Sequence, residues 1–112
     1  MQKNPERIAI DQGRTAVTMP DGSCQMTYFT MENGLTILAF DTASISAFPT
    51  SSEKVFAQVS ALPPYSIWFA MNSNGIAIPA RIETDGKIYM CNYTGSDLSN
   101  INFYGEVIYV RV

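Results

Sequence analysis

Short runs in which apolar and polar residues alternate cover most of the chain. Residues 76–83 give the clearest example, with one apolar face and one mixed face: Ile76, Ile78, Ala80 and Ile82 against Ala77, Pro79, Arg81 and Glu83. A period of two predicts a β-strand. Because proline has no amide proton to donate, Pro79 predicts that this strand lies at a sheet edge or is locally irregular.

A hairpin is predicted directly after this strand. The sequence Thr84-Asp85-Gly86-Lys87 separates it from a second alternating run, residues 87–93. Asp-Gly between two such runs is a strong hairpin signal, because both residues tolerate a positive φ.

The same pattern recurs along the rest of the chain. Further strands are predicted over residues 7–10, 15–19, 25–31, 35–40, 65–71 and 105–112, with turns at 11–13, 20–23, 32–34, 72–75 and 95–97. Many short strands divided by turn residues are typical of an all-β sandwich. We therefore predict one small, antiparallel, jelly-roll-like β-sandwich domain over residues 1–112.

Residues 50–62 fit two structures. Thr50 and Glu53 have the spacing of a helix capping box, and Val55, Phe56, Val59 and Leu62 follow at helical intervals. Residues 55–60 also alternate as a strand would. The local pattern leaves helix and strand open.

The last strand is apolar on both faces, with Ile108, Val110 and Val112 on one side and Val107 and Tyr109 on the other. Such a strand is either central in a sandwich or part of a subunit interface. We take Val107 and Tyr109 as the candidate interface residues.

Composition excludes several classes of function. The chain has 112 residues, 46% of them hydrophobic, and its 7 basic and 10 acidic residues give a net charge of −3. It is therefore not a disordered chain, and no basic field favours a nucleic acid as partner. The chain contains no run of about 18 apolar residues, so no insertion into a membrane is predicted. Residues 1–7 lack the apolar stretch of a signal peptide.

The reactive side chains argue against catalysis. The chain contains no histidine, which excludes triads with an imidazole base and histidine-ligated zinc. Its two cysteines, Cys24 and Cys91, are predicted to be buried free thiols. The carboxylates Asp41, Glu53, Asp97 and Glu106 stand in no catalytic signature. We expect no enzyme activity, no metal and no cofactor.

Three segments together resemble a known family. They are Val59-Ser60-Ala61-Leu62-Pro63-Pro64-Tyr65, the hairpin residues 82–89 and the closing strand 104–110. In this arrangement, residues 55–112 are similar to the C-terminal, receptor-binding β-domains of bacteriophage tail-fibre and baseplate proteins, particularly of phages and prophages of Gram-positive bacteria. The turn at Pro63-Pro64-Tyr65 departs from the family's longer Pro-Gly-Tyr-like turn, and residues 1–50 show no resemblance.

The resemblance implies a virion module without catalytic activity. Such a β-sandwich is often a homotrimer in the tail or baseplate, is assembled in the host cytoplasm with other tail or baseplate proteins, and binds a bacterial cell-wall saccharide. The chain would then be the whole module or the C-terminal domain of a longer tail protein. The resemblance also favours a strand over residues 55–60.

Saccharide binding requires flat apolar rings that stack on C–H groups and planar polar groups that pair with hydroxyls. Regular alternation turns Trp68 outward, although a core tryptophan is the alternative. Tyr89 and Tyr93 share a face with Cys91, and residues 95–102 form a polar loop. The candidate saccharide-binding residues are Trp68, Tyr89, Tyr93, Asn92, Asp97 and Asn100.

Two other functions remain open at this point. One is a cellular carbohydrate-binding module or adhesin domain that belongs to no virion. The other is a purely structural trimerisation domain, in which the strip formed by Tyr89 and Tyr93 faces the threefold axis.

Overall fold

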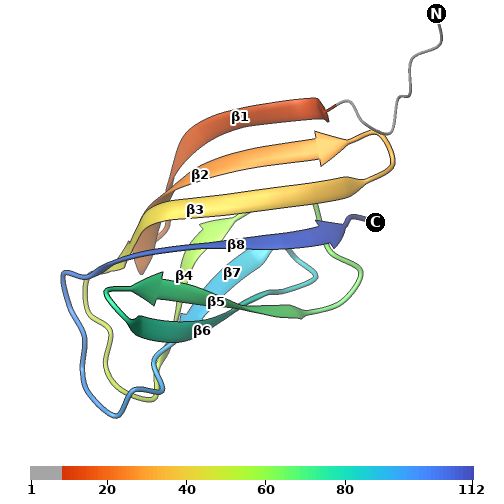
Figure 1. The fold of residues 1–112 in the computed structure, drawn as a ribbon. Coiled ribbons are helices and arrows are strands. Elements are labelled where there is room, and N and C mark those ends of the chain that lie inside the picture. The colour runs from red at the N-terminus through yellow and green to blue at the C-terminus, as the bar shows by residue number, and fades with distance from the viewer. Residues whose placement is uncertain (1–8) are drawn as a thin grey trace, which may run out of the picture.

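The computed structural model describes residues 9–112, and within this range the chain forms eight strands and no helix (Figure 1). In chain order they are β1 (Ala9–Thr18), β2 (Gly22–Met31), β3 (Leu35–Ile45), β4 (Glu53–Gln58), β5 (Ile67–Ser73), β6 (Ile76–Ile82), β7 (Lys87–Cys91) and β8 (Asn102–Val110). Every pairing between these strands is antiparallel. The predicted all-β class is confirmed. None of the described residues forms a helix long and apolar enough to cross a membrane.

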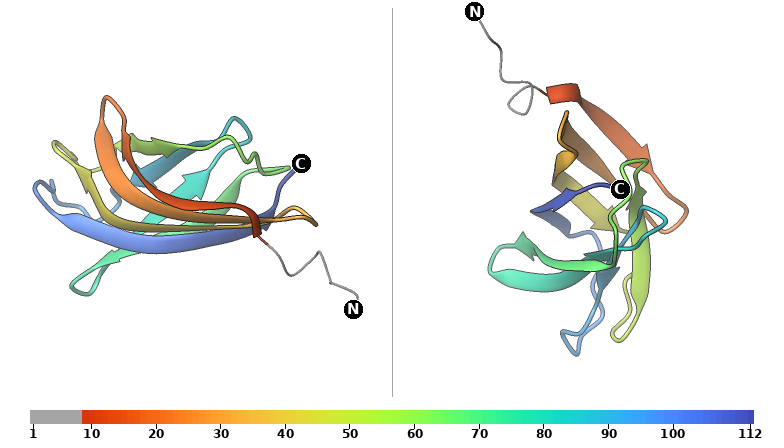
Figure 2. Two further views of the ribbon diagram at one scale, coloured as in Figure 1. Left: turned by 90° about the horizontal axis from the view of Figure 1, so that it is seen from above. Right: turned by 90° about the vertical axis from the view of Figure 1, so that its right-hand side faces the viewer.

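The strands form one sheet in the order β1-β2-β3-β8-β5-β6-β7-β4. Figure 2 shows that this sheet curls on itself, so that β4 and β7 lie across from β1, β2 and β3. The two edge strands, β1 and β4, approach each other without pairing. The result is a sandwich-like, nearly closed barrel with one core on its inner face.

Large apolar side chains from both halves of the sheet fill this core. The most deeply buried include Leu38, Phe56, Met71, Ile78, Ile82, Ile88, Met90 and Phe103. The rings of Phe40 on β3 and Phe56 on β4 meet edge to face at 5.3 Å between centroids. Because aromatic pairs of this geometry stabilise by about 0.5–1.5 kcal/mol beyond burial, this contact helps to hold the two halves together. Cys24 and Cys91 are buried free thiols, as predicted.

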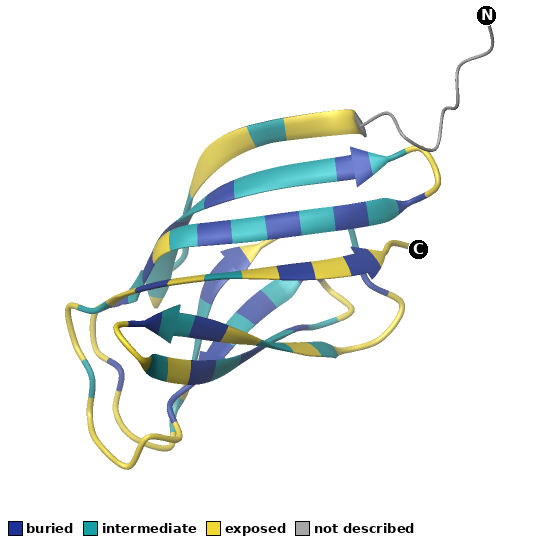
Figure 3. Ribbon diagram, viewed as in Figure 1, coloured by how far each residue is buried: buried dark blue, intermediate teal, exposed yellow. Residues whose placement is uncertain are grey.

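Strand β8 is central in the sheet, between β3 and β5. Its residues alternate between buried and exposed along the strand (Figure 3). Val107 and Tyr109 are only 4% and 5% exposed, and the Tyr109 hydroxyl donates a hydrogen bond to the Ala61 carbonyl oxygen. Burial raises the pKa of Tyr109 to about 12. Val107 and Tyr109 are therefore core residues of this chain and not the interface residues that the sequence suggested.

The N-terminal strand is longer than predicted. Residues 7–10 and 15–19 were expected to be two strands with a turn at 11–13, whereas β1 continues from Ala9 to Thr18; residues 7 and 8 lie outside the described range. Gly13 pairs with Tyr28 of β2. A Cβ at Gly13 would stand 2.8 Å from the Tyr28 hydroxyl oxygen, so the glycine makes room for the tyrosine ring and forms no turn.

Strand β4 decides between helix and strand in favour of a strand, although it covers residues 53–58 and ends before residues 59 and 60. It pairs with β7, and a bulge between Val55 and Ala57 interrupts the register. As a result Phe56 and Ala57, although neighbours in sequence, are both buried. This break in the alternation explains why the pattern also fitted a helix.

The predicted hairpin between β6 and β7 is confirmed. The amide of Gly86 donates to the Glu83 carbonyl oxygen at 2.9 Å, and Gly86 has a φ of 85°. The neighbouring turn between β5 and β6 uses Asn74 and Gly75, both at positive φ.

Pro79 does not mark an edge strand, because β6 lies between β5 and β7. Of the two predicted alternatives, the edge strand is wrong and the local irregularity is confirmed, because the ladder to β7 begins only at Ala80. At Pro79 itself, β6 has a paired neighbour on the β5 side alone, so the missing amide proton disrupts no ladder.

Candidate functional site

A row of large side chains crosses the outer face of β5, β6 and β7. Trp68 on β5 pairs with Arg81 on β6, and Arg81 pairs with Tyr89 on β7. Residues directly opposite each other in an antiparallel sheet place their side chains on the same face. The alternate residues of these strands point into the core, so the three side chains stand next to one another on the outside.

The Arg81 guanidinium lies between the two rings. Its Cζ atom is 5.4 Å from the centroid of the Trp68 ring and 4.6 Å from that of Tyr89. Both distances are within the range of a cation–π interaction. Because the guanidinium contacts both rings, it joins them into one continuous row.

Glu53 on β4 holds Arg81 in this position. Arg81 Nη1 donates to Glu53 Oε2 at 2.7 Å, and Nη2 donates to Oε1 at 2.9 Å. This two-point pairing fixes the plane of the guanidinium. The hydrogen bond from Arg81 lowers the pKa of Glu53 below its usual value and raises that of Arg81 above its usual value.

Three further side chains complete the arrangement. The Cys91 thiol and the Tyr93 hydroxyl donate to Glu53 Oε2 at 3.3 Å and 3.4 Å, and Arg81 Nε lies 3.4 Å from Glu83 Oε1. Burial and the neighbouring Glu53 carboxylate raise the pKa of Cys91. Cys91 is therefore a protonated hydrogen-bond donor at neutral pH and not a reactive thiolate. We call Trp68, Arg81, Tyr89, Glu53 and Tyr93 the outer-face cluster.

The cluster presents apolar ring surface to solvent. Trp68 is 55% exposed and Tyr93 is 59% exposed, which excludes the alternative of a core tryptophan. Tyr89 is half-buried. The cluster thus brings together three of the residues that the sequence singled out.

Asn92 lies elsewhere and has a structural role. It is fully buried, and its Nδ2 donates to the carbonyl oxygens of Phe48 and Ser96 at 2.8 Å and 2.9 Å. Its Oδ1 accepts from the amide and hydroxyl of Thr94. Since both ends of the amide are engaged by the protein, Asn92 is corrected from a candidate ligand contact to the anchor of its loop.

Asp97 and Asn100 are exposed in the same loop. Asp97 Oδ1 accepts a hydrogen bond from the Thr50 amide at 2.9 Å, and Asn100 has a φ of 55°. Within residues 9–112, no hydrogen bond or ion pair joins either side chain to the outer-face cluster. Asp97 and Asn100 are therefore not connected to the aromatic residues of the outer-face cluster.

The sequence interpretation missed Arg81 and Glu53. Counting back from the Asp85-Gly86 turn pairs Arg81 with Tyr89, so the strand register carries a signal for Arg81. The spacing of Glu53 from Thr50 instead suggests a capping box. The true role of Glu53 depends on the pairing of β4 with β7, which joins segments far apart in sequence.

A second feature of the outer face lies on β2, β3 and β8. Phe29 pairs with Ile37, Ile37 with Ile108, and Leu35 with Val110. Ile108 and Val110 are 55% and 56% exposed. We call these five residues the outer apolar patch.

Comparison with solved structures finds the same fold in a phage protein. The crystal structure of the head domain of phage bIL170, described in connection with the receptor-binding domains of lactococcal phages, superposes with a TM-score of 0.60. The match covers 91% of this chain and 100% of that domain. This chain has the fold of that head domain.

The two sequences are only 12% identical, so the likeness extends to the fold and not to the residues of the outer-face cluster. No protein-family model and no curated protein sequence matches the chain. The resemblance to phage receptor-binding domains that the sequence suggested is thereby supported at the level of the fold.

Proposed function

We propose that this chain is a receptor-binding domain of a phage tail or baseplate, and that its outer-face cluster binds a saccharide of the bacterial cell surface. The observation that carries the proposal is the row of Trp68, Arg81 and Tyr89, in which Glu53 holds the Arg81 guanidinium in place. The shared fold with a phage head domain supports the viral context. In this proposal the domain binds without catalysis, and it is assembled into the virion in the host cytoplasm with other tail or baseplate proteins.

The charge balance of the cluster favours a neutral ligand. The one positive charge of Arg81 already faces the carboxylates of Glu53 and Glu83. Little positive field therefore remains for a phosphate or carboxylate group. The exposed ring faces of Trp68 and Tyr93 instead suit the C–H faces of neutral sugars, and the tyrosine hydroxyl suits their hydroxyl groups.

Truncation of the exposed rings tests this proposal. In a binding assay with cell-wall polysaccharide from a Gram-positive host, Trp68→Ala and Tyr93→Ala are each expected to weaken binding about tenfold, equivalent to about 1.4 kcal/mol. Tyr104→Ala is the matched control, because Tyr104 is also 59% exposed but lies on β8 outside the cluster. Full affinity in both cluster variants, or an equal loss in Tyr104→Ala, would contradict the assignment.

The outer apolar patch supports a second proposal, assembly as a homotrimer. Exposed contiguous apolar surface of this kind marks a protein contact site, and the patch belongs to the layer opposite β4 and β7. A structural trimerisation role would use this surface rather than Val107 and Tyr109, whose side chains face the core.

A charge placed in the patch tests the trimer. Light scattering is expected to give a trimer for the unaltered chain and a monomer for Ile108→Glu, because a buried unpaired carboxylate at an interface costs several kcal/mol. Ala77→Glu adds the same charge on β6, outside the patch, and is expected to leave the trimer intact. A monomeric unaltered chain, or a trimeric Ile108→Glu variant, would refute this part of the proposal.

A further inference from the structure

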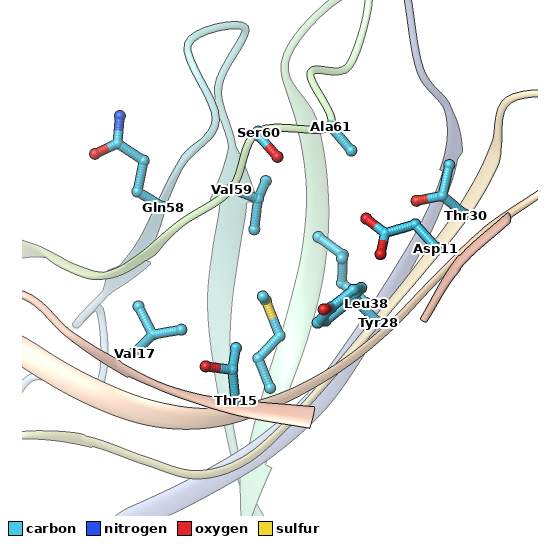
Figure 4. Close-up of a pocket in the computed structure, with 11 residues that line it drawn as sticks. Asp11, Thr15, Val17, Tyr28, Thr30, Leu38, Gln58, Val59, Ser60 and Ala61 are labelled. Carbon is cyan, nitrogen blue, oxygen red and sulfur yellow. The ribbon is translucent and has the colours of Figure 1, made fainter. Parts of the chain in front are cut away.

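The curl of the sheet leaves an opening between its two edge strands. Strands β1 and β4 are the two ends of the sheet and do not pair with each other. The end of β4 and the segment that follows it, residues 58–61 together, pass over this opening (Figure 4). The pocket beneath it has a volume of about 240 Å³.

The pocket has an apolar floor and a polar rim. Val17, Met26 and Leu38 supply the floor from β1, β2 and β3. The rim carries polar side chains from β1, β2 and the covering segment: Asp11, Thr15, Tyr28, Thr30, Gln58 and Ser60. In Figure 4 the Asp11 carboxylate and the Ser60 hydroxyl face the space from opposite sides. An apolar surface with a few convergent polar groups is the usual design of a small-molecule site.

Five of the six polar side chains of the rim have no partner among the described residues, whereas the Thr15 hydroxyl donates to the Ala16 carbonyl oxygen at 3.3 Å. Within residues 9–112, the side chains of Asp11, Tyr28, Thr30, Gln58 and Ser60 make no hydrogen bond to another protein group. Toward residues 9–112, their hydrogen-bonding capacity is thus unused. Among the described residues, Asp11 is the one charged residue that lines the pocket.

We propose that this pocket binds a single polyol the size of one sugar ring that carries a protonated amine. The Asp11 carboxylate pairs with the ammonium group, because a charge-assisted hydrogen bond is about twice as strong as a neutral one. Hydroxyl groups of the ligand pair with Thr15, Gln58 and Ser60. The C–H face of the ring packs on Met26 and Leu38.

Size and charge both support this ligand class. The pocket volume of about 240 Å³ is below the roughly 300–1,000 Å³ of sites for drug-sized molecules, so one ring fits and a chain of several rings does not. The negative charge of Asp11 disfavours phosphate and carboxylate ligands.

Arg111 limits how the ligand can lie. It lines an adjoining hollow that shares Asp11, Thr30 and Ser60 with the pocket. Its guanidinium would repel an ammonium group placed there. The amine must therefore reach Asp11 from the side of Tyr28 and Thr15.

A titration of the isotope-labelled domain followed by amide NMR shifts tests the proposal. Glucosamine, at a pH where its amine is protonated, is expected to shift the amides of Thr15, Thr30 and Ser60 saturably. N-acetylglucosamine, which is neutral, is expected to bind about tenfold more weakly, and glucuronate, which is anionic, is expected to produce no shifts. Asp11→Asn should abolish the preference for glucosamine, whereas Glu106→Gln, which removes the same charge from the outer face of β8, should retain it.

A second variant blocks the pocket without changing any charge, so it tests binding in the pocket independently of electrostatic effects. Ser60→Phe places a ring at an exposed rim position and is expected to abolish the shifts for every sugar. The proposal fails if glucosamine leaves the pocket amides unshifted or if Asp11→Asn keeps the preference for the amine. Shifts centred on Trp68 would place the sugar on the outer-face cluster, which would overturn the pocket assignment while supporting the proposed receptor site.

Discussion

Gly86→Ala is expected to destabilise the fold by about 3 kcal/mol or more, through two separate costs. Gly86 has a φ of 85°, and a residue with a Cβ pays about 1–2 kcal/mol in that conformation. The added Cβ would also lie 2.1 Å from the Val59 carbonyl oxygen. Because this neighbour is backbone, no side-chain rotation relieves the clash. The turn must move away from residues 59–62 and lose the hydrogen bond from the Val59 amide to the Gly86 carbonyl oxygen.

Gly75→Ala provides the matched control in urea unfolding followed by circular dichroism. Gly75 has a φ of 86°, but nothing lies within 4 Å of its added Cβ. It should therefore cost only the conformational strain, about 1–2 kcal/mol. Equal free energies of unfolding for the two variants would show that the hairpin does not dock against residues 59–62 as described.

Asn92→Ala is expected to lower the free energy of unfolding by about 3 kcal/mol. The substitution removes four hydrogen bonds at once, those to the carbonyl oxygens of Phe48 and Ser96 and those from the amide and hydroxyl of Thr94. Each bond contributes about 0.5–1.5 kcal/mol net, and the Thr94 amide is left without a protein partner, whereas the Phe48 carbonyl keeps the Leu98 amide and the Ser96 carbonyl keeps the Thr94 hydroxyl. The residue links two loops that are 44 positions apart in sequence.

Asn33→Ala is the control for this loss, measured in the same unfolding experiment. Asn33 Oδ1 accepts one hydrogen bond from the Leu35 amide in an exposed turn, so its removal should cost about 1 kcal/mol or less. If Asn92→Ala proved as mild as Asn33→Ala, the side chain would not be the anchor of its loop.

The sequence predicted those features that depend on local pattern. Alternation and turn chemistry identified the β6–β7 hairpin, and alternation also turned Trp68 and Tyr89 outward. These predictions succeeded because the side-chain period of a strand and the φ demands of a turn are set by neighbouring residues.

Features that depend on distant partners were not predictable in the same way. The sequence around Gly13 predicts a turn, because the residues near it carry no signal that Tyr28 packs over it. Val107 and Tyr109 occupy one apolar face of β8 and Ile108 and Val110 the other, and only the position of the strand in the sheet decides which face is buried. The sequence predicts a ligand contact at Asn92 because its partner Phe48 lies far away in the chain.

The outer-face cluster illustrates both cases. Its aromatic residues follow from composition and alternation, whereas its rigidity follows from Glu53, which reaches Arg81 only because β4 returns to pair with β7. The proposed binding surface therefore depends on the completed sheet. An aromatic strip without Arg81 and Glu53 would be a flexible surface, and ordering it on binding would cost free energy.

A fluorescence titration tests the proposed receptor site most directly, because Trp68 is the single tryptophan of the chain. Its ring is exposed at one end of the row that Trp68, Arg81 and Tyr89 form, so its emission depends on what covers the cluster. Addition of cell-wall polysaccharide from a host strain is predicted to change the Trp68 emission saturably, with the same affinity that calorimetry gives. Calorimetric binding with no change in the Trp68 emission would contradict the proposed site, because the saccharide would then bind away from the cluster.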